Sequence, residues 1–185
     1  MISKNTALII IDVQNGFDEP YWGVRNNLNA EDNMGKLLRA WRKHHFPVFH
    51  VKHNSTELSS PLRPERPGNA IKSLVKPLKR EPLFIKNVNS AFIGTDLEKA
   101  LKEKNIRDLV IVGLTTDHCV STTTRMGANL GFSCTVVSDA TATFNRNGYN
   151  GKNYTGQEMH EMALVSLQNE FASILDTMSV LKKLR

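Results

Sequence analysis

Short runs of aliphatic and β-branched residues alternate along the chain with segments whose apolar residues recur three and four positions apart. The runs are Ala7 to Val13, Pro47 to Val51, Pro82 to Lys86, Leu109 to Leu114, Cys134 to Ser138 and a weaker Ala172 to Leu175. Several of them are apolar without a period of two, which is typical of parallel strands covered on both faces. These runs predict six strands.

The segments between the runs predict helices. Their apolar stripes are Met34, Leu37, Leu38 and Trp41; Leu97, Ala100 and Leu101; and Met159, Met162, Ala163, Ser166, Leu167 and Phe171. Asp96 and Thr155 suit N-caps, and Gly131 suits the end of a helix that begins near Cys119. Strand and helix thus alternate, which predicts an α/β fold: a three-layer α/β/α arrangement with a parallel sheet and right-handed crossovers.

Two segments match neither pattern. They are Phe17 to Leu28 and the connection from Asn54 to Arg80, which contains prolines at 61, 64, 67 and 77. Long irregular loops in compact domains are usually functional, so we expect these two to form walls of a site.

Length and composition place limits on the class of protein. The chain has 185 residues, of which 40% are hydrophobic and 23% charged, which fits one globular domain over residues 1–185. The longest aliphatic stretch, Ala7 to Ile11, is far shorter than the roughly 18 to 20 residues of a membrane span. The first residues show no export signal. We therefore expect a cytoplasmic protein that does not bind membranes.

The net charge of +6 is concentrated between Pro61 and Lys86, where seven cations face two acids. No aromatic residues are interleaved with these charges and no recognition motif accompanies them, so a solvated surface is favoured over a nucleic-acid interface. An anionic substrate or partner is the remaining alternative. The two cysteines, Cys119 and Cys134, match no disulfide framework or zinc pattern and are expected to be free thiols.

Candidate chemistry lies where the predicted strands end, because ligands of open parallel sheets bind outside the carboxyl ends of the strands. Asp12 lies near the end of the first run, Lys86 ends the third, and Cys119 follows the fourth. Each alone has an ordinary explanation as a turn residue, a solvated lysine or a small core residue. Together they form a nucleophile set in which Asp12 accepts the thiol proton, while Lys86 and a helix start are expected to favour the thiolate. The set indicates acyl transfer.

Three separated motifs carry a family resemblance. They are Ala-Leu-Ile-Ile-Ile-Asp-Val-Gln-Asn-Gly-Phe at 7–17, Lys86 followed by Asn-Val-Asn-Ser-Ala-Phe, and Gly-Leu-Thr-Thr-Asp-His-Cys-Val-Ser-Thr-Thr-Thr-Arg at 113–125. With Asp139-Ala140-Thr141 and His160 downstream, the chain resembles the isochorismatase-like cysteine hydrolases over nearly its whole length.

The resemblance implies a six-stranded sheet of order 3-2-1-4-5-6 and a triad of Asp12, Lys86 and Cys119. It also implies an oxyanion hole formed by the backbone N–H groups of Thr115 and Cys119, with a cis peptide bond between Leu114 and Thr115. Family members often form dimers or tetramers, so a homodimer or homotetramer is expected here. Amidases of the family use the cysteine, whereas isochorismatases that cleave a vinyl ether typically lack it. Cys119 therefore favours hydrolysis of a small amide, carbamoyl or ureido compound through a thioester.

Nicotinamidases of this family also carry an Asp-x-His motif and bind a metal. Here the second run continues as His50-Val51-Lys52-His53, without that aspartate. Residues three apart on a strand face opposite sides, so His50 and His53 are not expected to chelate one ion. We therefore predict no metal and no other cofactor.

Several residues are candidates for substrate contact. They are Phe17, Trp22, His53, Phe92 and His118, although each aromatic could equally belong to the core. His118 adjoins Cys119, but neighbouring residues of a helix do not face one another, which argues against a Cys-His dyad. His160 is expected to be a hydrogen-bonded structural residue.

Two other functions compete with the hydrolase. A non-catalytic family member could bind small molecules or act as a scaffold, although an intact triad argues against it. Alternatively, Cys119 could be a redox-sensing thiol beside a basic nucleic-acid surface, but the chain offers no resolving cysteine because Cys134 is expected to be buried.

Overall fold

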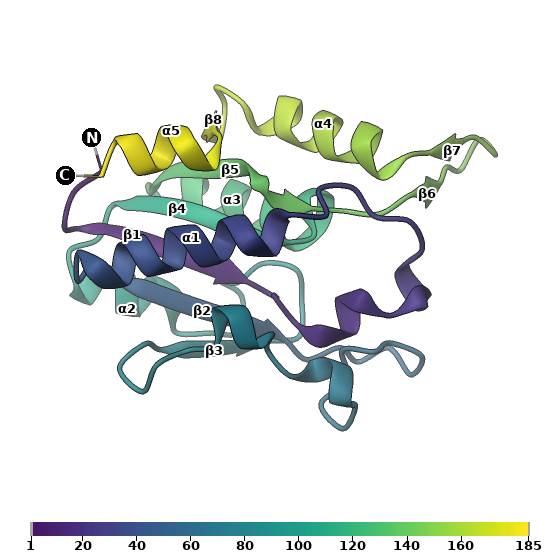
Figure 1. Cartoon of the computed structure of the whole chain (residues 1–185), viewed down its shortest axis with the longest axis horizontal. Coiled ribbons are helices and arrows are strands. Elements are labelled where there is room, and N and C mark those ends of the chain that lie inside the picture. Colours follow the sequence, from purple (N-terminus) through teal and green to yellow (C-terminus); the bar gives the residue numbers. More distant parts are fainter. Residues whose placement is uncertain (1, 185) are drawn as a thin grey trace.

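A six-stranded parallel sheet forms the centre of the molecule (Figure 1). The computed structural model describes residues 2–184. The strands are β1 (Thr6–Ile11), β2 (Val48–His53), β3 (Leu83–Lys86), β4 (Asp108–Leu114), β5 (Ser133–Ala142) and β8 (Ala172–Leu175). Their order is β3-β2-β1-β4-β5-β8, which confirms the predicted order because β8 is the sixth strand of this sheet.

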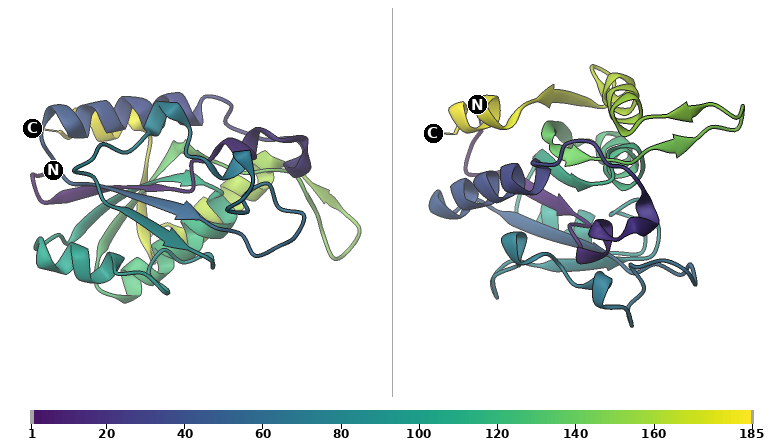
Figure 2. Two further views of the ribbon diagram at one scale, coloured as in Figure 1. Left: turned by 90° about the horizontal axis from the view of Figure 1, so that it is seen from below. Right: turned by 45° about the vertical axis from the view of Figure 1, so that its right-hand side comes forward.

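Helices cover both faces of the sheet (Figure 2). They are α1 (Ala30–Lys43), α2 (Leu97–Glu103), α3 (Ser121–Asn129), α4 (Gly156–Leu167) and α5 (Thr177–Lys182). Apolar residues of α1 and α5 share one core with one face of the sheet, while α2 and α4 contribute to a second core on the other face together with Val120, which immediately precedes α3. The predicted three-layer α/β/α class is therefore confirmed.

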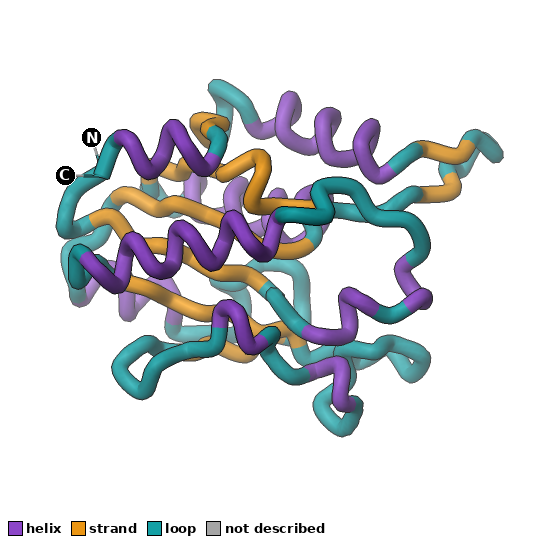
Figure 3. The backbone as a smooth tube through the Cα atoms, viewed as in Figure 1, coloured by secondary structure: helices purple, strands orange, loops and turns teal. Residues whose placement is uncertain are grey.

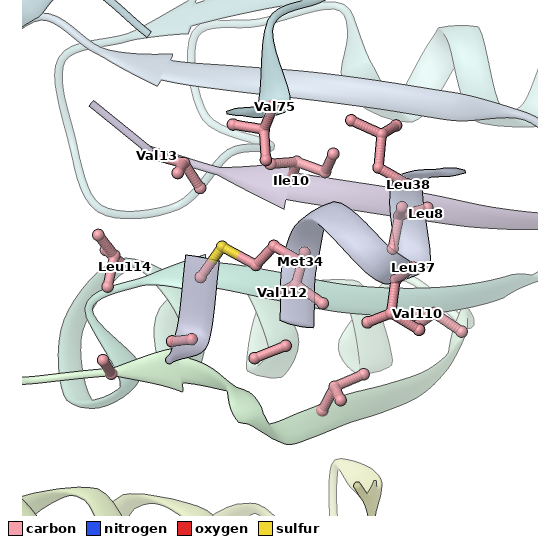
Figure 4. Packing of buried hydrophobic residues seen from close by; sticks show 14 of the residues in the cluster. Leu8, Ile10, Val13, Met34, Leu37, Leu38, Val75, Val110, Val112 and Leu114 are labelled. Atoms are coloured by element: carbon pink, nitrogen blue, oxygen red, sulfur yellow. The ribbon is translucent and has the colours of Figure 1, made fainter. Parts of the chain in front are cut away.

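Helix α1 shows how the sequence builds one of these layers. Met34, Leu37, Leu38 and Trp41 are fully buried or nearly so, and they share one core with Leu8, Ile10, Val110 and Val112 of the central strands. Figure 4 shows this packing for Met34, Leu37 and Leu38. Acidic residues occupy the first turn of the helix and basic residues the last turn, which is the arrangement that complements the helix dipole. The apolar stripe therefore fixes which face of α1 lies on the sheet.

The strand order reverses between β1 and β4, which lie side by side at the centre of the sheet. Gly113 pairs with Ile11 there and has a φ of 131°, and a Cβ at this position would lie 2.0 Å from the Ile11 carbonyl oxygen. Only glycine allows this close approach of the two strand ends. The crevice at such a reversal is where open α/β sheets bind ligands.

Some elements differ from the sequence predictions. The last apolar stripe extends to Phe171, but α4 ends at Leu167 because the backbone of Gln168 is extended. The sequence patterns also missed α5 and a two-stranded hairpin that projects from the body (Figure 3). The hairpin consists of β6 (Arg146–Asn147) and β7 (Asn153–Tyr154).

The two unassigned segments are mostly irregular, with short 3₁₀ turns. These turns are Asn15–Asp18, Pro20–Trp22, Pro67–Asn69 and Ser73–Val75. Gln14 and Asn69 join the segments to the end of β2 through side-chain hydrogen bonds to the backbone of His53. Across residues 2–184, no helix has the length and apolar character needed to cross a bilayer.

Candidate active site

Asp12, Lys86 and Cys119 come from three different elements and meet at the carboxyl end of the sheet. Asp12 directly follows β1 with a φ of 53°, a left-handed conformation that aspartate tolerates better than most residues. Lys86 is the last residue of β3. Cys119 lies in a single π-helical turn, Thr116–Val120, that leads from β4 into α3. Such π turns occur frequently at functional sites.

The Lys86 ammonium is the centre of this group. Its Nζ donates to Asp12 Oδ2 at 2.6 Å, to His53 Nδ1 at 3.1 Å and to Cys119 Sγ at 3.3 Å. The side chains of Lys86 and Asp12 are both fully buried. A buried lysine therefore satisfies all three of its hydrogens with protein acceptors.

Asp12 uses only one of its carboxylate oxygens. Oδ2 accepts from Lys86, whereas Oδ1 is buried and has no hydrogen-bond partner among the described residues. Burial raises the pKa of Asp12 above the usual carboxyl range, although the nearby Lys86 charge opposes this. The site thus holds a free acceptor oxygen of increased basicity next to a thiol.

The Cys119 thiol does not have the environment that the sequence suggested. Burial, and secondarily the Asp12 charge, raise the pKa of Cys119 more than Lys86 lowers it. The expectation of a resting thiolate is therefore wrong. The helical segment already begins at Thr116, so Cys119 is not at its first residue. The neutral thiol contacts Asn89 Oδ1 at 3.7 Å.

The turn before the cysteine has the predicted backbone. The peptide bond between Leu114 and Thr115 is cis, which confirms the prediction made for it. Thr115 is nearly fully buried. The assignment of the Thr115 and Cys119 N–H groups to an oxyanion hole remains a prediction.

Comparisons with known proteins show which family the chain belongs to. The family model described as "Isochorismatase domain" matches residues 6–179. The isochorismatase family protein YrdC of Bacillus subtilis is 47% identical over 95% of this chain and 94% of its own length. The chain belongs to the isochorismatase family. It is accordingly an isochorismatase-family hydrolase.

Two further proteins extend the comparison. A crystal structure of an isochorismatase-family protein from Chromobacterium violaceum has a TM-score of 0.95 and 37% identity, and the match covers 100% of this chain and 95% of that one. Nicotinamidase 3 of Arabidopsis thaliana is 28% identical over 94% of this chain and 86% of its own length. The fold of this hydrolase is therefore shared with the Chromobacterium violaceum protein, and its sequence is similar to that of nicotinamidase 3.

The two histidines of β2 have separate partners in this isochorismatase-family protein. His50 Nε2 lies 3.0 Å from Glu81 Oε2, while His53 contacts Lys86. Sequence reasoning missed another group with the spacing of a metal site. Donor atoms of Asp12, His53 and Cys119 lie within 4.8 Å of one another. The Lys86 Nζ bonds to all three donors, so the position that a divalent cation would need is taken by the ammonium. These residues do not fit a metal ion in this arrangement.

Two of the three aromatic candidates, Phe17 and Phe92, lie in the cores, and the partly buried Trp22 packs against one of these cores. Phe17 is 5% exposed, stacks with Phe144 and contacts Trp22 with a tilted ring. It also lines a cavity of about 660 Å³ that Asp12, Lys86 and Cys119 do not line. Phe92 is 8% exposed and stacks on Phe132. Packing accounts for Phe17 and Phe92, and their contact with substrate stays a prediction.

The remaining candidates surround the π turn. The His118 side chain is half exposed and lies near Asp117 and Arg146. His160 is buried and its Nδ1 lies 2.8 Å from the Thr116 hydroxyl, as expected for a structural histidine. Sequence reasoning missed Asn89 as a neighbour of Cys119, although it lies in the quoted motif that follows Lys86.

Proposed function

We propose that this isochorismatase-family hydrolase cleaves the C–N bond of a small amide, carbamoyl or ureido compound through a thioester on Cys119. The observation that carries the proposal is the pairing of a buried thiol with a buried carboxylate whose Oδ1 has no partner. A neutral thiol needs a base at the moment of attack, and Asp12 offers one. The name of the relative nicotinamidase 3 supports amide hydrolysis as the reaction class.

In the first half of the reaction, Cys119 Sγ attacks the substrate carbonyl carbon while its proton passes to Asp12 Oδ1. The tetrahedral intermediate then collapses, the C–N bond breaks, and Asp12 returns the proton to the leaving ammonia or amine. Lys86 stays charged throughout. Its 3.3 Å contact with Sγ stabilises the negative charge that develops on sulfur during attack.

In the second half, Asp12 removes a proton from a water molecule that attacks the thioester carbonyl. The C–S bond breaks, the acid is released, and the proton returns to sulfur as the thiol. The backbone N–H groups of Thr115 and Cys119 are the proposed donors to the oxyanion in both halves. No step requires a metal, since Asp12 and Lys86 together provide the proton acceptor and the positive charge.

Ammonia or amine release from a panel of primary amides, N-carbamoyl amino acids and ureido acids, with nicotinamide and isochorismate included, tests the proposal. Cys134 is a matched control because it is also a buried thiol, but only burial raises its pKa, to about 12. We expect Cys119→Ala to lose at least about 10³-fold in rate while Cys134→Ala keeps the activity. Comparable C–N hydrolysis by Cys119→Ala, or turnover of isochorismate alone, would contradict it.

A further inference from the structure

The Lys86 ammonium uses its third hydrogen in a contact with His53, which indicates a role for this histidine. An ammonium group only donates hydrogen bonds, so His53 Nδ1, 3.1 Å from Nζ, must be the acceptor. The ring is then the neutral tautomer with its hydrogen on Nε2. Burial first, and the Lys86 charge second, lower the pKa of His53 to about 4, which keeps the ring neutral near pH 7.

The contact between His53 and Lys86 joins the ends of two neighbouring strands. His53 and Lys86 are direct partners in the parallel register of β2 and β3. The Gln14 side chain holds the backbone of His53 on both sides, accepting from its N–H at 2.9 Å and donating to its carbonyl at 3.0 Å. Gln14 is itself completely buried. The backbone that carries the imidazole is therefore held at two points.

The contact with His53 limits the number of hydrogens that Lys86 can donate to Asp12. With His53 and Cys119 each taking one hydrogen of Lys86, the ammonium has a single hydrogen left for Asp12 and gives it to Oδ2. Without the imidazole acceptor, the released hydrogen would be available to the unpartnered Oδ1. A hydrogen bond there would occupy the lone pair that has to receive the thiol proton.

We propose that His53 is a positioning residue that holds the third hydrogen of Lys86 and thereby keeps Asp12 Oδ1 free for the Cys119 proton. This inference rests on the proposed function, in which Oδ1 is the base. It differs from the expectation that His53 contacts substrate. A substrate contact made equally in the ground state would act on KM, whereas a hydrogen bond that occupies the base oxygen lowers kcat.

Three variants separate these roles. The Oδ1 of asparagine lies as many bonds from Cα as the Nδ1 of histidine, so His53→Asn can keep the acceptor, whereas glutamine places its carbonyl one bond further out. We expect His53→Ala and His53→Gln to lower kcat by about 10- to 100-fold, the range for one hydrogen bond to a charged group, with KM nearly unchanged. His53→Asn should recover most of the loss. Equal losses in all three, or a raised KM with unchanged kcat, would overturn the proposal.

Two measurements on the protein without substrate keep this test separate from that of the proposed function. In ¹⁵N NMR of the wild type, His53 should be the Nε2–H tautomer from pH 6 to 8. Iodoacetamide should alkylate Cys119 more slowly in His53→Ala and His53→Gln than in His53→Asn. In the first two variants the Lys86 ammonium turns toward Asp12 Oδ1 and stabilises the Cys119 thiolate less. An Nδ1–H tautomer, or identical alkylation rates, would show that His53 does not position Lys86 even if amide hydrolysis is confirmed.

Discussion

Strand β2 carries two histidines that belong to two buried charged clusters, and the clusters are built differently. His50 joins Glu81 and Arg42, with Glu81 accepting two bonds from Arg42 at 2.8 and 2.7 Å and one from the Leu78 N–H at 2.9 Å. His53 joins Lys86, Asp12 and Cys119 three residues later. Both carboxylates are at most 8% exposed, yet only Glu81 has partners on both oxygens.

The pKa values of the two carboxyls move in opposite directions as a result. Burial alone would raise the pKa of Glu81, but the bonds from Arg42, Leu78 and His50 outweigh it and lower the pKa to about 2. Burial raises the pKa of Asp12 because one ammonium does not compensate it. His50 Nδ1 also lacks a partner, but a neutral ring nitrogen loses less hydration than a carboxylate oxygen does. The first cluster stabilises its carboxylate as an anion, whereas the second leaves a carboxylate oxygen without a partner, as the proposed proton transfer requires.

The largest difference between the two clusters is expected in the free energy of unfolding that is lost when the cation is removed from each. Lys86→Met leaves Asp12 buried without its cationic partner, so we expect a loss of about 3 to 5 kcal/mol in the free energy of unfolding at pH 7. Arg42→Met leaves Glu81 with His50 and the Leu78 N–H, and the Arg42 side chain is already 23% exposed, so about 1 to 2 kcal/mol is expected. Urea unfolding at pH 7 measures both, and equal losses would contradict the comparison.

The pH dependence of the free energy of unfolding should distinguish the two clusters by the next largest effect. Because the folded pKa of Glu81 is depressed from 4.5 to about 2, its contribution is complete above pH 4.5 and is lost as the pH falls toward 2. The stability difference between wild type and Glu81→Gln should therefore shrink by about 3 kcal/mol over that window. Urea titrations at several pH values from 2.5 to 6 check this. A difference independent of pH would mean that Glu81 is not stabilised as a carboxylate.

The smallest difference is expected in the rates at which the two thiols, Cys119 and Cys134, are alkylated. Both cysteines are buried and both have raised pKa values, so neither forms appreciable thiolate at pH 7. We expect the rate of alkylation of both by iodoacetamide to increase through pH 9 without a plateau, as peptide mass mapping can follow. A plateau for Cys119 near pH 7 would restore the thiolate that the sequence suggested.

The sequence was sufficient for the sheet and for the meeting of Asp12, Lys86 and Cys119, because these depend on local pattern and on where strands end. Five consecutive aliphatic residues identify β1, and the strand order follows from the family resemblance. The short helix α5 was missed because its six residues carry too few apolar positions for a stripe.

Electrostatics could not be predicted in the same way. Cys119 was expected to ionise easily because Lys86 and a helix start adjoin it, but the burial that reverses this effect is a property of the folded site. The contact between His53 and Lys86 likewise depends on the register of β2 and β3, which no short motif specifies. Phe17 and Phe92 have the same ambiguity, since an aromatic side chain beside a site also suits the core.

The central claim is that Asp12 is the base that accepts the Cys119 proton, and Asp12→Asn tests it through two effects of opposite sign. Hydrolysis of a substrate found in the amide panel should fall by about 10²- to 10⁴-fold, because the proton acceptor is lost. Alkylation of Cys119 by iodoacetamide at pH 8 should become faster in the same protein, because the Asp12 charge no longer raises the thiol pKa. Retained hydrolysis, or slower alkylation in a folded variant, would contradict the account.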